Sequence, residues 1–220
     1  MMKLVLHIGT EKTGTTSIQG YLHRNAAMLA QHGFFYSQVL GRPNNIDISV
    51  YGRDLERDDQ FFLQRAIDDE EAFRFFRARL ARQLAAEVAA AQQAGCHTFI
   101  ISNEHCHSRL TKQEQVARVH ALLLPLFAEI EILCYLRPQV ELAVSLASTM
   151  ARQMRVTAAF FDAIDAADCY YDYGGLLDRW SRVFGRSAVM PIPFKSVANP
   201  AADFLRRIDF ADWNSVPNDR

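Results

Sequence analysis

Residues 2–22 read MKLVLHIGTEKTGTTSIQGYL, and this stretch decides the fold. It opens with a continuous apolar run over residues 3–8, which is typical of a strand buried on both faces, as in a parallel sheet. Gly9 ends the run, and a helix with an apolar stripe is predicted from residue 15 to residue 31. A buried strand, a glycine turn and a helix in succession form the first unit of an α/β protein.

The rest of the chain continues the alternation of strands and helices. Strands are predicted at residues 34–36, 98–102, 130–136 and 188–192, and helices at residues 70–94, 112–127, from 138 onward, 174–184 and 200–208. Residues 40–58 contain Gly, Pro and two Asn and are predicted to be irregular. This order predicts a three-layer α/β fold with a central parallel β-sheet flanked by helices, formed by one domain over residues 1–220.

Composition limits the classes of function. The net charge of -1 gives no support to a nucleic-acid binder held by a general basic field. The four cysteines are scattered and form no CxxC pair, which favours free thiols in a reducing compartment. The apolar run at the N-terminus is too short for a signal peptide or a membrane span. A cytoplasmic protein is therefore expected.

The turn after the first strand has the frame G-x-x-x-x-G, from Gly9 to Gly14. Such a frame arranges backbone N–H groups and a helix N-terminus around an anion. In a nucleotide triphosphatase the second glycine is followed by lysine, whereas here Thr15 and Thr16 follow and the lysine is Lys12. A turn with a solvated lysine is the alternative interpretation. The buried strand before the frame and the amphipathic helix after it favour anion binding.

The string HIGTEKTGTTSIQGYL resembles the 5′-phosphosulfate loop of the sulfotransferases that use 3′-phosphoadenosine 5′-phosphosulfate (PAPS), above all their bacterial and carbohydrate-directed branch. The resemblance implies a P-loop-containing sulfotransferase fold. It also implies that one group of residues holds the 5′-phosphate: Lys12, Thr13, Gly14, Thr15 and Thr16, with Ser17 assisting. Lys12 would in addition touch the transferred sulfuryl group.

A second nucleotide motif is predicted where the strand at residues 130–136 runs into Arg137. If a helix begins at Pro138, Ser145 lies about two turns along it. An arginine fork with a hydroxyl suits a phosphate monoester, although a surface Arg and a solvent-facing Ser are the alternative. The segment YLRPQVELAVSLAS resembles the family's 3′-phosphate motif, which implies that the nucleotide is PAPS rather than ATP.

An acid–base candidate follows the strand at residues 98–102. Sulfuryl transfer needs a base for the acceptor proton and positive charge near the leaving phosphate oxygen, which Lys12 can supply. The segment FIISNEHCH resembles the one that carries a catalytic glutamate in carbohydrate sulfotransferases, which implies Glu104 as the base. Cytosolic small-molecule sulfotransferases use a histidine in this region, so His105 or His107 is the rival. Neighbours in sequence seldom bind one metal together, and no metal is expected.

The final third of the chain, YYDYGGLLDRWSRVFGRSAVMPIPFKSV over residues 170–197, resembles the family's Tyr-x-x-x-Leu-x-x-Trp helix and following strand. The late basic or glycine-rich loop of the family has no counterpart after Arg206 and Arg207. Either the sequence is cut short or this loop is absent.

The predicted function is PAPS-dependent sulfuryl transfer to a carbohydrate or another small hydroxyl or amine acceptor, with 3′,5′-adenosine diphosphate as the product. A P-loop kinase and an inactive nucleotide-binding domain are the alternatives. The lysine's position argues against the kinase, because Thr15 stands where a kinase needs lysine. Residues 40–70 and 150–172 are expected to line the acceptor pocket.

Overall fold

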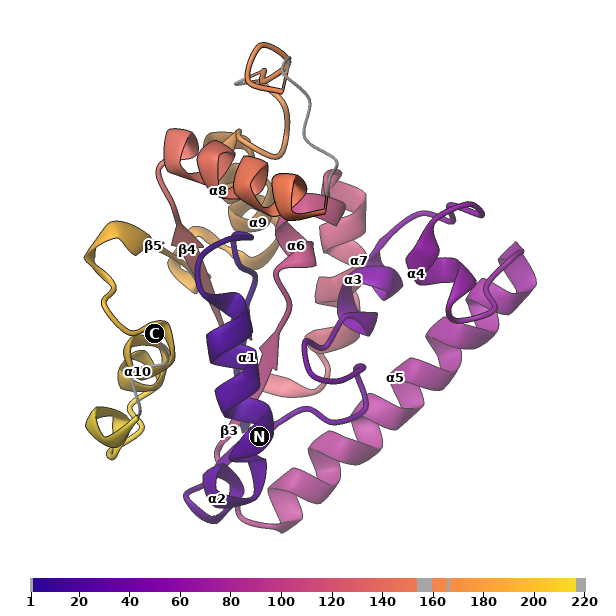
Figure 1. The fold of residues 1–220 in the computed structure, drawn as a ribbon. Helices are drawn as coiled ribbons and strands as arrows, with labels where there is room; N and C mark the ends of the chain where they lie inside the picture. Colours follow the sequence, from indigo (N-terminus) through magenta and orange to yellow (C-terminus); the bar gives the residue numbers. More distant parts are fainter. Residues whose placement is uncertain (1, 154–159, 166, 217–220) are drawn as a thin grey trace.

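The computed structural model describes residues 2–153, 160–165 and 167–216. Within these residues, five strands form one sheet in the order β2-β3-β1-β4-β5, and every neighbouring pair is parallel. The strands are β1 (Met2–His7), β2 (Phe34–Tyr36), β3 (Thr98–Ser102), β4 (Phe127–Leu136) and β5 (Val189–Pro193). Helices lie on both faces of the sheet, so the predicted three-layer α/β fold is confirmed (Figure 1).

The helices connect the strands in the predicted alternating order. They are α1 (Thr15–Arg24), α2 (Ala26–Gln31), α3 (Asp47–Gly52), α4 (Gln60–Leu63), α5 (Glu70–Gln93), α6 (His105–Arg109), α7 (Gln113–Leu123), α8 (Gln139–Arg152), α9 (Tyr173–Phe184) and α10 (Pro200–Arg207), with 3-10 turns at Arg186–Ala188, Phe194–Ser196 and Trp213–Ser215. The longest, α5, begins where the Asp69 carboxylate accepts the backbone N–H of Ala72 at 2.7 Å. Such a cap satisfies a helix N–H group that has no partner within the helix.

Alternate side chains of β1 enter two separate hydrophobic cores. Leu4 and Leu6 pack into a core that includes buried residues of α5, α7 and α9. Val5 points to the other face and packs with residues of α1, α2 and α10. Because successive side chains of a strand point to opposite faces, a central strand of this sheet must be mainly apolar on both faces. This requirement explains the continuous apolar run at residues 3–8.

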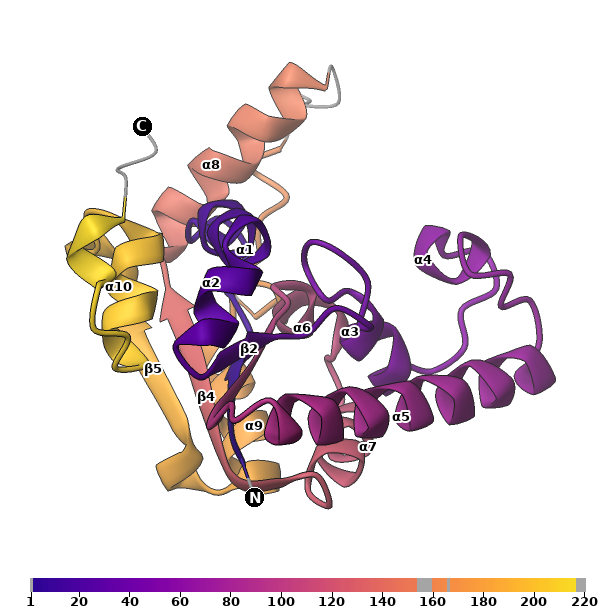
Figure 2. The ribbon, with the colours of Figure 1, turned by 90° about the horizontal axis from the view of Figure 1, so that it is seen from below.

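Two helices extend beyond the layers. Figure 1 shows α8 lying across the top of the molecule, at the end of the sheet where β4 finishes. Seen from below in Figure 2, α5 projects from the body on the side away from α10, and α4 lies near its far end. The carboxyl ends of the strands therefore face a region bordered by α8 and by the segment between α3 and α5.

The helix predicted over residues 15–31 is divided at Asn25. The Asn25 side chain donates to the carbonyl oxygen of Tyr21 at 2.9 Å, and the Asn25 backbone N–H contacts the same oxygen at 3.0 Å. The residue takes φ −109° and ψ 15°, so α1 ends there and α2 begins at the next residue. Side-chain bonds of this kind compete with the helical ladder, whereas the apolar spacing continues through the break.

The segment predicted to be irregular, residues 40–58, contains α3. This helix packs closely on α7, because a Cβ added at Gly52 would lie 2.8 Å from the Val119 side chain. Tertiary packing of this kind stabilises short helices that local propensity does not support. The helix predicted over residues 112–127 is shorter than expected, because β4 begins earlier than predicted.

Cys96, Cys106 and Cys134 are buried, Cys169 is exposed, and all four are free thiols. None of the described helices has both the length and the apolar character that crossing a bilayer requires.

Candidate active site

The ends of three adjacent strands meet at one edge of the sheet. β3, β1 and β4 are neighbours, so the segments that follow them emerge side by side, where parallel sheets bind ligands. Asn103 donates its backbone N–H to the carbonyl of His7 at 2.9 Å, and Tyr135 donates to the carbonyl of Gly9 at 2.6 Å. These two bonds hold the start of the loop over residues 9–16, here called the phosphate loop, against both neighbouring strands.

The phosphate loop turns into α1 through two residues in the left-handed region. Lys12 has φ 63° and Gly14 has φ 73°. Between them Thr13 is fully buried, and its hydroxyl donates to the carbonyl of Thr10 at 2.5 Å, which fixes the turn from inside. Gly14 is the N-cap of α1, so no side chain caps the first N–H groups of the helix. Uncapped N–H groups at a helix N-terminus form a favourable environment for an anion.

Both glycines of the G-x-x-x-x-G frame meet a steric requirement. A Cβ added at Gly9 would lie 3.1 Å from the Cα of Glu104, and one at Gly14 would lie 2.4 Å from Cγ of Pro200. Both residues also have positive φ values, which residues other than glycine rarely adopt. Gly9 thus lets the loop approach the segment after β3, and brings Glu104 next to it.

A cavity of about 240 Å³ opens between the phosphate loop and the start of α6. Its lining consists of Glu11, Lys12, Gly14, Thr15, Thr16, Glu104 and His105. The cavity therefore combines a cation, two hydroxyls and a helix N-terminus with carboxylates from two segments. Five other candidates from the sequence lie outside this lining, namely Thr13, Ser17, His107, Arg137 and Ser145.

Lys12 connects the phosphate loop to α8. Its Nζ donates to the hydroxyl of Thr149 at 3.1 Å, and this hydroxyl donates to the backbone carbonyl of Ser145 at 3.1 Å. Ser145 and Thr149 are four residues apart and lie on one face of α8, so the predicted Ser145 is one turn from the Lys12 contact. The sequence did not single out Thr149, which belongs to no motif and lies 137 residues from Lys12.

Arg137 also contacts the phosphate loop. Its Nη1 donates to the backbone carbonyl of Lys12 at 2.9 Å, and its Nε lies 3.6 Å from a carboxylate oxygen of Glu141. The guanidinium is 5.9 Å from the ring centre of Phe194, and the hydroxyl of Tyr173 donates to the Arg137 carbonyl at 2.7 Å. The structure thus brings the two predicted nucleotide motifs together on either side of Lys12, with the Arg137 side chain still 27% exposed.

Glu104 is held by a buried amide. Its Oε2 accepts a hydrogen bond from Nε2 of Gln19 at 2.6 Å, and the same nitrogen lies 3.4 Å from the carbonyl of Ser102. Gln19 is only 3% exposed. A neutral amide orients the carboxylate without neutralising its charge. The sequence did not single out Gln19, although a polar side chain on the buried stripe of an amphipathic helix was a usable signal.

His107 is buried with both ring nitrogens engaged. Its Nδ1 lies 3.5 Å from the backbone N–H of Glu11, and its Nε2 lies 3.0 Å from the carbonyl of Tyr170. Burial lowers the pKa of His107 from 6.5 to about 4, with partial compensation from the Glu11 charge. In this arrangement His107 is neutral near pH 7 and supports its neighbours, whereas His105 lines the cavity.

Glu11 is a second carboxylate at the cavity, and the sequence did not single it out. Burial alone would raise its pKa, but the nearby His105 and Ser108 side chains outweigh burial and lower the pKa to about 2. Its Oε1 lies 3.4 Å from Nδ1 of His105, and its Oε2 accepts the hydroxyl of Tyr170 at 3.0 Å. Glu11 is therefore an anion at neutral pH. Its polar partners His105 and Tyr170 come from segments that are distant in the sequence.

The segment over residues 53–63, here called the arm, borders the site beyond His105. Arg53 is 1% exposed, and its Nη2 lies 2.7 Å from Glu56 and 2.8 Å from Asp59. Asp59 also caps α4, and Phe61 of α4 lies with its ring 5.2 Å from the ring of His105. The arm therefore reaches the cavity wall through an aromatic contact.

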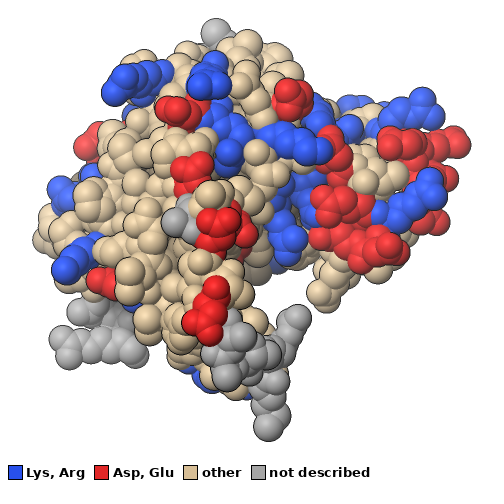
Figure 3. Space-filling view, turned by 90° about the horizontal axis from the view of Figure 1, so that it is seen from above, with Lys and Arg blue, Asp and Glu red and all other residues tan. Residues whose placement is uncertain are grey.

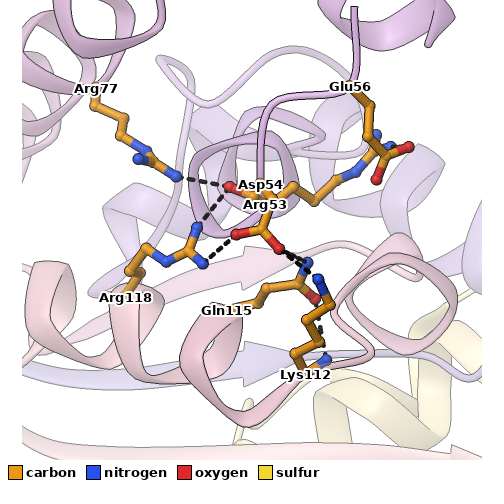
Figure 4. A network of polar contacts seen from close by, with 7 residues as sticks. All are labelled: Arg53, Asp54, Glu56, Arg77, Lys112, Gln115 and Arg118. Carbon is orange, nitrogen blue, oxygen red and sulfur yellow. Dashed lines mark hydrogen bonds and ion pairs between the residues drawn. The ribbon is translucent and has the colours of Figure 1, made fainter. Parts of the chain in front are cut away.

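A charged network fastens the base of the arm to α5 and α7 (Figure 4). Asp54 accepts hydrogen bonds from Lys112 at 3.0 Å, from Gln115 at 3.2 Å and from Arg118 at 2.5 Å. Arg77 and Arg118 both donate to the backbone carbonyl of Arg53, at 2.6 and 2.7 Å. Hydrogen bonds from Arg118 and Lys112 lower the pKa of Asp54 to about 2.

Parts of both segments that the sequence predicts to line the acceptor pocket lie beside the cavity. The arm lies within the predicted segment at residues 40–70, and Tyr170 within that at residues 150–172; residues 154–159 and 166 lie outside the described ones. Figure 3 shows basic and acidic side chains interleaved on the side that carries α4 and α5, in contrast to the mostly uncharged surface on the side of α10. No group of three His, Cys, Asp or Glu side chains suited to a metal ion occurs among the described residues.

The fold is similar to that of a solved sulfotransferase. The crystal structure of a sulfotransferase from Alicyclobacillus acidocaldarius matches with a TM-score of 0.53 and 18% sequence identity, over 98% of this chain and 82% of that one. At this identity the likeness is one of fold. No protein-family model and no curated protein matches the chain.

Proposed function

We propose that this protein is a sulfotransferase that transfers the sulfuryl group of PAPS to a hydroxyl or amine of a carbohydrate or another small acceptor. The observation that carries the proposal is the cavity in which Lys12 and the N-terminus of α1 lie beside Glu104. An anion site next to an oriented carboxylate suits transfer of a charged group to an acceptor that must lose a proton. The shared fold with a known sulfotransferase supports the same class.

The nucleotide would be held from two sides of the phosphate loop. Uncapped N–H groups at the start of α1, with Lys12, Thr15 and Thr16, suit the 5′-phosphate, and Thr13 and Ser17 maintain the turn around it. Arg137 donates to the Lys12 carbonyl, and Ser145 lies one helical turn from the Thr149 hydroxyl that Lys12 contacts, which suits a second phosphate on the same nucleotide. PAPS, with its 3′-phosphate, supplies both anions and the sulfuryl group.

Glu104 and Lys12 would divide the chemistry between them. As the acceptor oxygen bonds to sulfur, its proton passes to Glu104, whose carboxylate Gln19 orients. The bond between sulfur and the phosphate oxygen breaks, and Lys12 stabilises the charge that develops on that oxygen. The products are the sulfated acceptor and 3′,5′-adenosine diphosphate. His107, neutral and buried, would maintain the site rather than take the proton.

Nucleotide calorimetry tests the proposal. We expect 3′,5′-adenosine diphosphate to bind without a divalent metal, and more tightly than ATP with Mg²⁺. Tighter binding of Mg-ATP would favour the kinase. The free cysteines also suit a reducing compartment, and we propose a cytoplasmic location on that ground.

A variant provides a second test by calorimetry. Arg137→Ala should weaken 3′,5′-adenosine diphosphate by about 10- to 150-fold, the worth of a charge-assisted hydrogen bond. Binding of 5′-AMP measures how far the lost contact with the Lys12 carbonyl disturbs the phosphate loop. Equal weakening of both nucleotides would show that Arg137 serves the loop and not the 3′-phosphate.

A further inference from the structure

Three residues close a ring of hydrogen bonds beside the cavity. The backbone N–H of Glu11 points to Nδ1 of His107 at 3.5 Å, and Nε2 of His107 lies 3.0 Å from the carbonyl of Tyr170. The Tyr170 hydroxyl then donates to Oε2 of Glu11 at 3.0 Å. A neutral His107 with its proton on Nε2 satisfies every step, because Nδ1 accepts and Nε2 donates.

We propose that Glu11 is a positioning residue that couples occupation of the phosphate loop to the order of the segment around Tyr170, so that the bound nucleotide prepares the acceptor side. The inference rests on the proposed function, since it takes the nucleotide to be the ligand of the loop. It assigns to Glu11 no part in the chemical step.

The coupling begins in the backbone of the phosphate loop. Glu11 and Lys12 are consecutive, and their side chains reach to different parts of the molecule. Lys12 contacts Thr149 of α8, whereas Glu11 contacts His105 of α6 and Tyr170. An anion bound by Lys12 and the neighbouring N–H groups restrains this backbone, and the restraint passes directly to the Glu11 side chain.

Charge makes the contact between Glu11 and Tyr170 selective. The Glu11 side chain is 20% exposed and its pKa is about 2, so it carries a charge with little access to water. Burial and the Glu11 charge raise the pKa of Tyr170. The Tyr170 hydroxyl therefore stays protonated and donates a hydrogen bond to Glu11. A largely buried carboxylate that loses a donor retains an unmet desolvation cost. The position of Glu11 thus strongly favours one position of Tyr170.

Tyr170 in turn holds its own segment. Its backbone carbonyl accepts from His107, and its ring lies 5.0 Å from the His107 ring. The next residues form local backbone bonds, with Tyr171 and Asp172 both donating to the carbonyl of Asp168 at 2.8 and 2.9 Å. A restraint at Tyr170 therefore extends to the turn over residues 168–173, which leads into α9.

Hydrogen–deuterium exchange with 3′,5′-adenosine diphosphate as the probe tests the coupling. In the wild type we expect the nucleotide to slow amide exchange over residues 168–173 by about tenfold, which corresponds to about 1.4 kcal/mol. Glu11→Gln and Tyr170→Phe should remove most of this nucleotide-dependent slowing while still binding the nucleotide by calorimetry. Tyr171→Phe, at the neighbouring position, should retain it.

The outcomes separate this inference from the proposed function. A residue that only stabilised the fold would change exchange equally with and without nucleotide, so the difference between the two states is the decisive quantity. If the wild type binds the nucleotide and exchange over residues 168–173 stays unchanged, the coupling is wrong and the proposed function stands. Full slowing in Glu11→Gln overturns the coupling in the same way. If the nucleotide does not bind the wild type, both proposals fail.

Discussion

The two sides of the cavity are held in place by different kinds of interaction. On the side where we propose that the nucleotide binds, much of the geometry comes from the main chain, with left-handed residues at Lys12 and Gly14 and backbone bonds to β3 and β4. On the proposed acceptor side, the arm is held by charged side chains, such as Asp54 with Arg118. A surface built from the main chain keeps its shape when side chains change, whereas one built from ion pairs depends on each partner. Changes confined to the arm can therefore alter the proposed acceptor side without disturbing the phosphate loop, whereas changes at Tyr170 reach that loop through Glu11.

The largest effect is expected where the two sides meet. Glu104→Gln should reduce turnover by about 100- to 10,000-fold, the usual range for a lost general base. Affinity for 3′,5′-adenosine diphosphate should stay nearly unchanged, because the main chain of the phosphate loop is intact. Turnover would be measured with labelled PAPS on an acceptor found by screening sugars and phenols, and Glu114→Gln, an exposed change on α7, is the matched control.

The histidines decide how this result is interpreted. If Glu104→Gln turns over normally while His105→Ala or His107→Ala is inactive, a histidine is the base. The boundary between the two sides would then run through α6 and not through the end of β3.

The next effect concerns stability at low pH, since His107 lies between the two sides. Burial lowers the pKa of His107 to about 4 and that of His7 to about 3, so the unfolded chain binds these protons at higher pH than the folded one. Their contribution is complete above pH 6.5 and is lost as the pH falls toward 4. The free energy of unfolding should drop by about 1.4 kcal/mol per pH unit for each histidine in this window.

Urea titrations between pH 7.5 and pH 4.5 measure this slope. His107→Gln should make the slope shallower, while His32→Gln, at an exposed position, should leave it as in the wild type. Equal stability at pH 7.5 and pH 5 would contradict the buried, neutral state of His107.

The smallest effect isolates the acceptor side. Asp54→Asn removes the charge that Lys112 and Arg118 share, and the arm should become less ordered. Because the pair is partly exposed and screened, we expect only about a two- to fivefold rise in KM for the acceptor, with nucleotide affinity unchanged. Asp58→Asn, at an exposed position of the same arm, is the control. A fall in nucleotide affinity in Asp54→Asn would show that the arm and the phosphate loop are not independent.

The difference in construction also explains how far the sequence could predict the molecule. The strands and the phosphate loop follow from local rules, because a buried run and a G-x-x-x-x-G frame leave few alternatives for the chain. Arg137 could be located because it follows a strand end, and Ser145 because its spacing from Arg137 resembles the family's 3′-phosphate motif. The α/β fold with a parallel sheet is confirmed by the strand order.

The residues that sequence reasoning missed act through contacts between distant segments. Gln19 reaches Glu104 across 85 positions, and Tyr170 reaches Glu11 across 159. The Tyr170 contact leaves no pattern in the neighbouring residues, and Gln19 is marked only by its place on the buried stripe of α1. The helix α3 was missed for a similar reason, because it forms through packing on α7 rather than through its own propensity.

The central place of β1 has a consequence for how the molecule is made. Both strands that flank β1 are synthesised long after it, and the residue that contacts Lys12 on α8 follows 137 positions later. At about 5–20 residues per second, that contact becomes possible roughly 7–27 s after Lys12 leaves the ribosome. Until β3 and β4 emerge, the apolar strand has two unpaired edges. The yield of active protein should therefore depend on translation speed and on chaperones that shield nascent chains.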